Sequence, residues 1–364
     1  MFTLTAIVTF ILVLSILILF HEYGHFSVAR LCGVGVQTFS LGFGPKLWSK
    51  KVGETEYCLC AFPLGGYVRM VGDDPTEEIP EEDKARSFLA ATLPRKIAIV
   101  VAGPFFNFIL AFFVFFGIFM VGVPVLAPDV GEVDSGSPAA MGGILAGDKI
   151  VSINEKQITQ WDEIRETIQE SNGSALRFLV LRAGANKSLT ITPMKKEIKD
   201  VFGDLQPSFI IGVLPGKTQF TKRYDPITAF GLGLLRTGQM IELNTIGIFK
   251  LIQGKIASDN IGGPILIAKM AADQAEQGLL NVLLFAAMIS INLGVINLFP
   301  IPVLDGGHLL FFLIEAVMRR PLSIKAREMA SQVGLFLLVS LMVFAFYNDF
   351  MRFDVIGFFT RLFS

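Results

Sequence analysis

The distribution of apolar residues along the chain predicts four helices that cross a membrane. About 20 apolar residues in a helix span the hydrocarbon layer of a bilayer. Four stretches reach this length without a charged residue: 1–20, 97–127, 279–304 and 329–348. No positive residue comes before Arg30, so the first stretch lacks the basic start of a cleaved signal peptide, and we expect it to be retained.

Three other segments carry shorter patterns. Residues 127–195 combine strand-like runs with Gly-rich turns and a short helix over 161–170, which predicts an α/β module. Residues 35–71 alternate like strands, so they form either a cytoplasmic hairpin or a structure that dips into the bilayer, where protein must shield its backbone. Residues 228–256 are apolar but interrupted by charges, and we expect them to lie along the outer interface.

The predicted fold is therefore a polytopic α-helical membrane protein with four transmembrane helices, a membrane-associated β-hairpin region and one α/β domain. Its first part contains a transmembrane helix at 1–33, a cytoplasmic or reentrant β region and loop at 34–96, and a second transmembrane helix at 97–126. The α/β domain follows at 127–195, and a linker with interfacial helices at 196–278. A broken third transmembrane helix at 279–318 and a fourth at 329–350 complete the predicted fold.

Lysine and arginine are concentrated in two of the loops. They occur repeatedly between the first and second spans, and Arg319, Arg320, Lys325 and Arg327 fall between the third and fourth. Cytoplasmic loops carry such an excess of positive residues. We therefore expect both loops in the cytoplasm, and the α/β domain and both termini outside it.

Composition agrees with a membrane protein. The chain is 52% hydrophobic and only 17% charged, against about 25% in soluble domains. Positive and negative residues nearly cancel to a net charge of −1, which gives no electrostatic basis for nucleic-acid binding. The three cysteines form no disulfide or zinc-knuckle pattern, and we expect ordinary buried thiols.

A metal-binding motif lies inside the first predicted span. His21 and His25 are four residues apart, so both imidazoles lie on one face of a helix, with Glu22 beside them. This spacing is typical of two zinc ligands and a general base. Polar groups are costly at membrane depth and mark function by default. The alternative is a polar cluster at a helix end that reaches the interface.

A catalytic zinc needs a third protein ligand and an open fourth position. The candidate is Asp305, which follows two prolines and precedes two glycines in a predicted helix break. Backbone of this kind is tolerated at membrane depth only where it is buried in protein or lines a cavity. Asp305 also suits the N-cap of the next helix. His308 is a rival third ligand, with a packing role as its alternative.

Two amides occur in otherwise apolar surroundings, Asn107 in the second span and Asn297 before the helix break. Each has two interpretations, a hydrogen bond to a neighbouring helix or a contact with substrate backbone near the metal. Asn297 is the better candidate for function because it precedes the break.

These motifs together resemble the site-2 protease family of intramembrane metalloproteases, in its bacterial regulator-of-sigma-E branch. The carriers are HEYGHF at 21–26, GPFFNF at 103–108 and NLFPIPVLDGGH at 297–308, with PLGGYVRM at 63–70 and GGPILIAK at 262–269 in support. Residues 137–154 resemble a bacterial PDZ domain. The best-known enterobacterial relatives carry two tandem PDZ domains, and this chain has room for one.

The resemblance implies specific roles. His21, His25 and Asp305 would bind Zn2+, Glu22 would be the catalytic acid and base, and Asn107, Asn297 and Pro300 would contact substrate. The 35–71 region would be a membrane-reentrant β-loop that presents substrate as an added strand.

The expected function is an intramembrane zinc metalloprotease of the bacterial inner membrane, surrounded by lipid. Its expected substrates are single-span membrane proteins, such as anti-sigma factors or remnant signal peptides. Two alternatives remain, a catalytically inactive membrane PDZ scaffold and a zinc transporter that uses the same three ligands.

Overall fold

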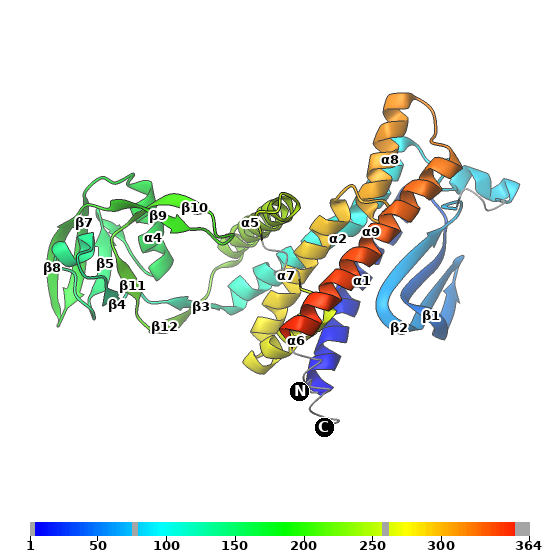
Figure 1. Ribbon diagram of the computed structural model, residues 1–364. Helices are drawn as coiled ribbons and strands as arrows, with labels where there is room; N and C mark the ends of the chain where they lie inside the picture. The colour runs from blue at the N-terminus through cyan, green and yellow to red at the C-terminus, as the bar shows by residue number, and fades with distance from the viewer. Residues whose placement is uncertain (1–3, 75–78, 257–261, 354–364) are drawn as a thin grey trace, which may run out of the picture. The chain divides into compact units, whose positions relative to one another are not determined.

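The computed structural model describes residues 4–74, 79–256 and 262–353, and the chain divides into two compact units. The helical unit is formed by residues 1–117 and 230–364, and the β-rich unit by residues 118–229. We describe each unit by itself (Figure 1).

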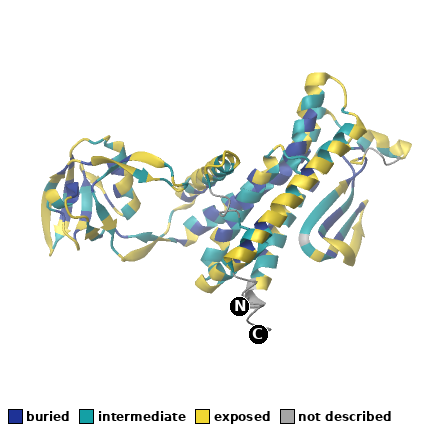
Figure 2. Cartoon of the chain, viewed as in Figure 1, coloured by how far each residue is buried: buried dark blue, intermediate teal, exposed yellow. Residues whose placement is uncertain are grey.

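The helical unit is built mainly from long helices: α1 (Leu4–Leu31), α2 (Leu93–Val121), α5 (Pro226–Ile252), α6 (Pro264–Gln277), α7 (Leu279–Leu298), α8 (Asp305–Met318) and α9 (Ile324–Arg352). Within the described residues, α1, α2, α7 and α9 are long and apolar enough to cross a membrane. The prediction of four such helices is confirmed. Figure 2 shows that the surface of α9 is largely exposed, as an apolar helix facing lipid would be.

The third predicted span is interrupted, and the interruption forms part of the functional site described below. Helix α7 ends at Leu298 and α8 begins at Asp305, so residues 299–304 form a non-helical connection. Pro300 and Pro302 lie in this connection. Proline has no backbone N–H to donate, so it ends or breaks a helix.

Small residues bring the helices close together around this connection. A Cβ atom at Gly24 of α1 would overlap the carbonyl oxygen of Ala102 in α2, and one at Gly294 of α7 would lie 3.0 Å from the carbonyl oxygen of Pro104. Small residues allow helix backbones to approach closely in membrane proteins. Helix α2 is therefore in direct contact with both α1 and α7.

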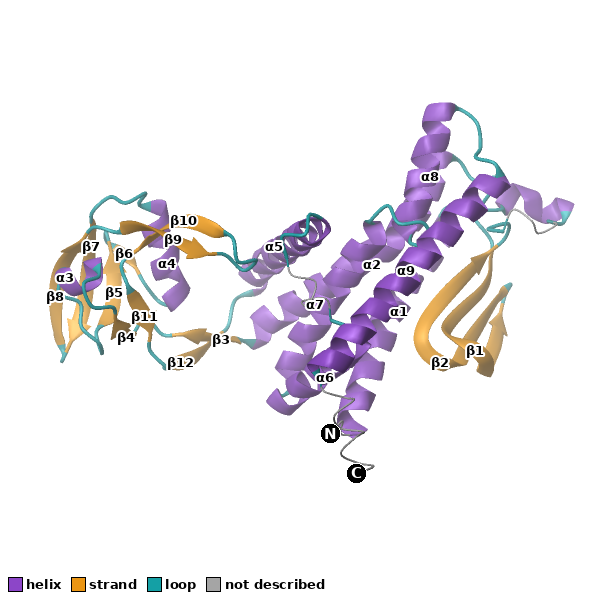
Figure 3. Cartoon of the chain, in the orientation of Figure 1, coloured by secondary structure: helices purple, strands orange, loops and turns teal. Residues whose placement is uncertain are grey.

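Residues 35–71 form a sheet from two long bent strands, β1 (Val36–Val52) and β2 (Thr55–Met70). Thr38 pairs with both Arg69 and Glu56, so the first half of β1 lies between the two halves of β2. Gly42 and Gly44 have positive φ angles where β1 bends. The second half of β2 therefore lies at an edge of the sheet (Figure 3).

The sheet is fixed to the helices by a small apolar core. This core contains Phe26 and Ala29 from α1, Ile99 from α2, and Val36, Phe39 and Met70 from the strands. Cys58 and Cys60 are buried on β2, whereas Cys32 is partly exposed, and all three thiols are free.

The β-rich unit contains a four-stranded sheet in the order β6 (Lys156–Gln157), β5 (Lys149–Ile153), β7 (Leu176–Arg182) and β8 (Ala185–Ile191). Its helices are α3 (Pro138–Met141) and α4 (Trp161–Glu170). Three further pairs join β3 (Val123–Leu126) to β12 (Gln219–Lys222), β4 (Val130–Val133) to β11 (Val213–Pro215) and β9 (Met194–Lys199) to β10 (Leu205–Ile210).

The expected boundaries of this domain, 127–195, are too narrow. Ile211 is 2% exposed and belongs to the same core as Ile150 and Phe178, and β11 and β12 pair with strands at the start of the unit. Partners separated by more than 80 residues leave no local signal in the sequence.

The expected linker at 196–278 also contains a packed helix. Helix α6 contacts α1, α7 and α9. Asp349 of α9 is fully buried and accepts hydrogen bonds from the backbone N–H groups of Gly263, Ile265 and Leu266 at the start of α6. These bonds satisfy N–H groups that have no partner within the helix.

Candidate active site

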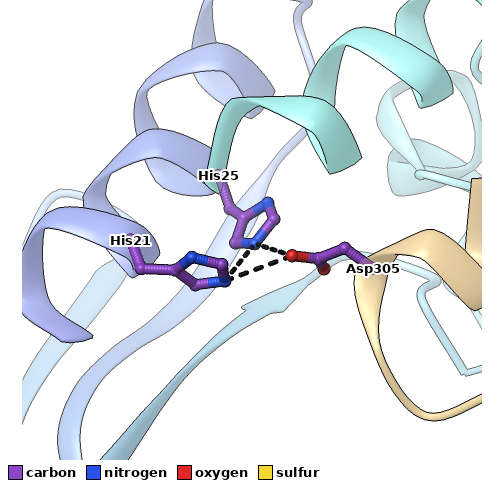
Figure 4. A group of neighbouring side chains, drawn as sticks. All are labelled: His21, His25 and Asp305. Carbon is purple, nitrogen blue, oxygen red and sulfur yellow. Dashed lines mark hydrogen bonds and ion pairs between the residues drawn. The ribbon is translucent and has the colours of Figure 1, made fainter. Parts of the chain in front are cut away.

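The two histidines of the first motif converge because they occupy successive turns of α1. Both His21 and His25 are 8% exposed, and their Nε2 atoms lie 3.2 Å apart. Residues four positions apart lie on one face of a helix, so this face of α1 presents two imidazoles to a common point. Figure 4 shows both rings directed toward Asp305.

Asp305 reaches the histidines from the other side of the helix break. Its Oδ2 lies 3.2 Å from His21 Nε2 and 3.5 Å from His25 Nε2. Asp305 is the first residue of α8, but its side chain does not cap that helix. Its carboxylate is directed toward the histidines, so the N-cap alternative does not describe it.

The connection before Asp305 is tightly constrained. Val303 has a φ of 89°, a conformation that a β-branched residue rarely adopts. A Cβ at Gly306 would overlap the carbonyl oxygen of Phe299, and one at Gly334 of α9 would overlap that of Pro302. The glycines therefore let α8 and α9 pack directly on the loop that positions Asp305. Strained backbone of this kind is concentrated at functional sites.

The three ligand atoms fit a zinc ion. Zinc–nitrogen bonds of about 2.0–2.1 Å in a tetrahedral arrangement place ligand atoms about 3.3 Å from one another. The three separations here are 3.2, 3.2 and 3.5 Å. Asp305 Oδ2 is buried and accepts no hydrogen bond from the described residues. Two imidazoles and a carboxylate are a donor set that zinc uses when a fourth position stays open.

Helix α2 supplies the outer partners of both histidines. His25 Nδ1 donates to the carbonyl oxygen of Ile99 over 2.8 Å, which leaves the lone pair of Nε2 facing Asp305 in the neutral ring. Asn107 is fully buried, and its Nδ2 lies 3.1 Å from His21 Nδ1. Sequence reasoning missed Ile99 because its contribution is a backbone carbonyl, which any residue carries.

A cavity of about 840 Å³ opens beside the three ligands within the helical unit. Glu22, Asn297 and His308 all line it. Asn297 is thus placed where a substrate contact is expected. His308 lies outside the group formed by His21, His25 and Asp305 among the described residues.

Two residues expected to contact substrate have other positions. Asn107 and Pro300 do not line this cavity among the described residues. Asn107 of α2 is fully buried against α1 and α7, and Ser290 Oγ of α7 donates to its backbone carbonyl oxygen. Pro300 lies on the exposed side of the connection. Of the two interpretations of Asn107, the structure shows the contact with a neighbouring helix.

The edge of the β1–β2 sheet forms one wall of the cavity. Residues Gly65 to Val68 and Met70 all line it. A Cβ at Gly66 would lie 2.9 Å from Cγ of Glu22, so glycine is needed for the strand to approach α1 so closely. An edge strand carries backbone groups that can pair with another extended chain.

Charged residues surround another part of the cavity, and sequence reasoning did not identify them. They come from the loop after β2 and from α2 and α9: Asp73, Asp74, Lys96, Arg327 and Glu328. Arg327 pairs with Glu315 of α8. These charged residues come from three segments that are far apart in the sequence, so no spacing reveals that they share a wall.

Comparisons with known proteins find relatives over most of this chain. A model of peptidase family M50 matches residues 9–341. A protein of Agrobacterium fabrum, named as a candidate zinc metalloprotease, is 38% identical over 360 aligned positions, which cover 94% of this chain and 95% of the relative. The regulator of sigma-E protease RseP of Salmonella typhimurium is 32% identical over 443 aligned positions, which cover 94% of this chain and 98% of that protein.

Two further details come from these comparisons. The alignment with the Salmonella protein is longer than the 364 residues of this chain, so that protein contains segments that this chain lacks. Among solved structures, the PDZ domain of an SdrC-like protein from Listeria monocytogenes is 22% identical, covers 24% of this chain and 84% of that domain, and has a TM-score of 0.20.

Proposed function

This chain belongs to peptidase family M50, and we propose that it is a site-2 zinc protease that hydrolyses peptide bonds within membrane-spanning segments. The family resemblance drawn from the motifs is confirmed. The observation that supports the proposal best is the convergence of His21, His25 and Asp305, with Glu22 on the wall of the adjoining cavity.

Each residue then has a distinct role. His21, His25 and Asp305 would hold the zinc, which when bound lowers the pKa of a coordinated water and polarises a carbonyl group. Glu22 accepts a proton from the attacking water and delivers it to the leaving amine. Asn297 would bind the substrate backbone, a role that its position on the wall of the same cavity supports.

The substrate must be extended when it is cut. A transmembrane helix uses its backbone carbonyls in internal hydrogen bonds, so it must unwind before water can attack one of them. The edge formed by residues 65–70 would accept the unwound segment as an added strand, a role that its position on the cavity wall supports. Helix-breaking residues in a substrate should therefore favour cleavage.

The proposed setting is the bacterial inner membrane. Helices α1, α2, α7 and α9 would cross it, and the lysines and arginines of the two loops would lie in the cytoplasm. The β-rich unit, which we take as the single PDZ domain, and both termini would then be extracytoplasmic. Single-span proteins of the anti-sigma type and remnant signal peptides are the proposed substrates, since a relative is named a regulator of sigma-E protease.

Metal dependence tests this proposal. Purified protein in liposomes is incubated with a single-span substrate that carries a helix-breaking residue in its membrane segment. We expect cleavage to stop when a chelator removes the metal and to return when zinc is added. Cleavage that continues in metal-free protein would contradict the proposal. Movement of zinc into the liposomes without cleavage would favour the transporter.

A further inference from the structure

Asn107 has an unbalanced hydrogen-bonding environment. Its side chain is fully buried, its Nδ2 lies 3.1 Å from Nδ1 of His21, and its Oδ1 is buried without a partner among the described residues. Buried polar atoms in proteins are nearly always hydrogen-bonded. The orientation of this amide must therefore be considered together with the protonation of His21, the residue that it contacts.

The orientation with Nδ2 toward His21 conflicts with a ligand role for that histidine. A donating amide requires Nδ1 to accept, and in a neutral imidazole the proton then lies on Nε2. Nε2 is the atom that faces His25 and Asp305. A protonated Nε2 has no lone pair for a metal ion.

Turning the amide by 180° about its last bond resolves this conflict. The oxygen and nitrogen of an asparagine amide are nearly identical in shape, so their assignment follows from the hydrogen bonds around them. With Oδ1 toward His21, Nδ1 keeps its proton and donates it. In either orientation, one atom of the amide lacks a hydrogen-bond partner among the described residues, so these partners do not fix the orientation. The need for a free lone pair on Nε2 of His21 does.

The second histidine already has this arrangement. His25 Nδ1 donates to the carbonyl oxygen of Ile99, which can only accept. Ile99 and Asn107 are both on α2, which runs antiparallel to α1. Ile99 therefore contacts His25, and Asn107 contacts His21. Metal-bound histidines generally donate their other N–H to such an acceptor, which fixes the ring and its tautomer.

We infer that Asn107 is a positioning residue whose Oδ1 accepts the Nδ1 proton of His21 and thereby directs the Nε2 lone pair of His21 to the metal. This inference rests on the proposed zinc site and assigns Asn107 a role other than substrate binding. The hydroxyl of Ser290 on α7 donates to the backbone carbonyl of Asn107 over 2.8 Å, a bond that does not involve the amide side chain.

The test compares zinc affinity among three variants of the full-length protein, measured in detergent by competition with a chromogenic chelator. Asn107→Leu keeps the approximate shape but removes the acceptor, and we expect zinc affinity to fall about 10–100-fold. Asn107→Asp offers acceptors only, as in carboxylate–histidine–zinc triads, and should bind zinc at least as tightly as the original protein. Ser290→Ala is the matched packing control and should bind zinc normally.

The outcomes are distinct. Wild-type affinity in Asn107→Leu would overturn the inference. So would a loss in Asn107→Asp as large as in Asn107→Leu, because an amide that donates to His21 cannot be replaced by a carboxylate. If Asn107→Leu fails to fold, Asn107→Asp still decides, with the absorption spectrum of bound cobalt(II) reporting whether the ligand geometry is kept. The assay measures zinc binding without a substrate. Its result can therefore be interpreted even if the protein does not cleave membrane-spanning segments.

Discussion

At the scale of single residues, the choice of the third ligand is the first point to test. Asp305 Oδ2 lies within 3.5 Å of both histidine Nε2 atoms, whereas His308 lines the cavity outside this group. Asp305→Ala should therefore lose most of the bound zinc, and His308→Ala should keep about one zinc per chain. Metal analysis of the two purified variants checks this. An empty site in His308→Ala together with a full one in Asp305→Ala would reverse the assignment.

The three residues that converge at the site were predictable from the sequence, but the residues that contact their outer atoms were only partly so. The HExxH spacing and an aspartate at a proline-rich break each have a local pattern. The link between Asn107 and His21 joins residues 86 positions apart, and that between Ile99 and His25 joins residues 74 apart. Helix packing brings these pairs together, so no motif could assign the role of Asn107.

A buried ion pair in the β-rich unit gives a pH dependence at this scale. Asp148 is fully buried, and burial alone raises the pKa of its carboxyl group, but two hydrogen bonds from Arg182 and one from the N–H of Leu145 lower that pKa overall. A carboxylate whose folded pKa is below its unfolded pKa stabilises the fold above the unfolded value, about 4. This stability is lost as the pH falls through the folded pKa.

Arg182→Gln tests this pair. Removing one partner leaves the buried carboxylate of Asp148 without its compensating charge, so the unit should lose stability at pH 7. Unfolding is followed by the fluorescence of Trp161, with Trp48 replaced by phenylalanine. The difference between the original protein and the variant should shrink as the pH falls below about 4, because Asp148 is then protonated first in the unfolded chain and, at lower pH, in the folded original protein as well. A difference that is constant with pH would show that Asp148 is not the group responsible.

At the scale of helices and strands, a set of hydrogen bonds connects α6 to α9. Asp349 accepts three backbone hydrogen bonds at the start of α6. Asp349→Ala should lower stability by about 2–4 kcal/mol, because it removes a cap and leaves buried N–H groups unpaired. Hydrogen exchange at Gly263, Ile265 and Leu266 should accelerate.

A matched control for this change is Asp273→Ala, which removes an exposed carboxylate from α6 itself. It should leave both stability and exchange unchanged. Equal effects of the two substitutions would mean that the cap does not hold α6 in place.

The strands also show what a sequence pattern leaves open. Alternation over 35–71 predicted β structure, and the bends fall at glycines that the sequence displays. The pattern did not predict that the first half of β1 pairs with both halves of β2. Register depends on the path of each strand after it bends, and two strands with similar alternation allow several pairings.

At the scale of the whole molecule, the distribution of lysine and arginine predicts the orientation in the membrane. Cysteines introduced at Glu82 and Ser174, both exposed, should be labelled from opposite sides of the membrane, with Ser174 outside. Cys32, the partly exposed native thiol, is first replaced by serine, while Cys58 and Cys60 are buried. Labelling of both positions from the same side would contradict the four-span arrangement.

The division into two units also shows the limit of prediction at this scale. The start of the domain was visible in its Gly-rich turns, but its end was not, because β11 and β12 return to pair with β4 and β3. A deletion of 127–195 would remove β4 and leave β11 without its partner strand. Experiments on the role of this domain should therefore treat residues 118–229 as one unit.

The central claim is that Glu22 acts as a general base beside a zinc held by other residues. Glu22→Gln is nearly isosteric and removes none of the three proposed ligands, so zinc content should stay at about one per chain. The amide cannot accept the proton of the attacking water, and a positioned base contributes about 10²–10⁴-fold. Zinc content and cleavage of a single-span substrate are measured on the same purified sample. Retained zinc with cleavage lowered by at least 100-fold, the lower end of that range, is the predicted result. Retained zinc with undiminished cleavage would contradict the account.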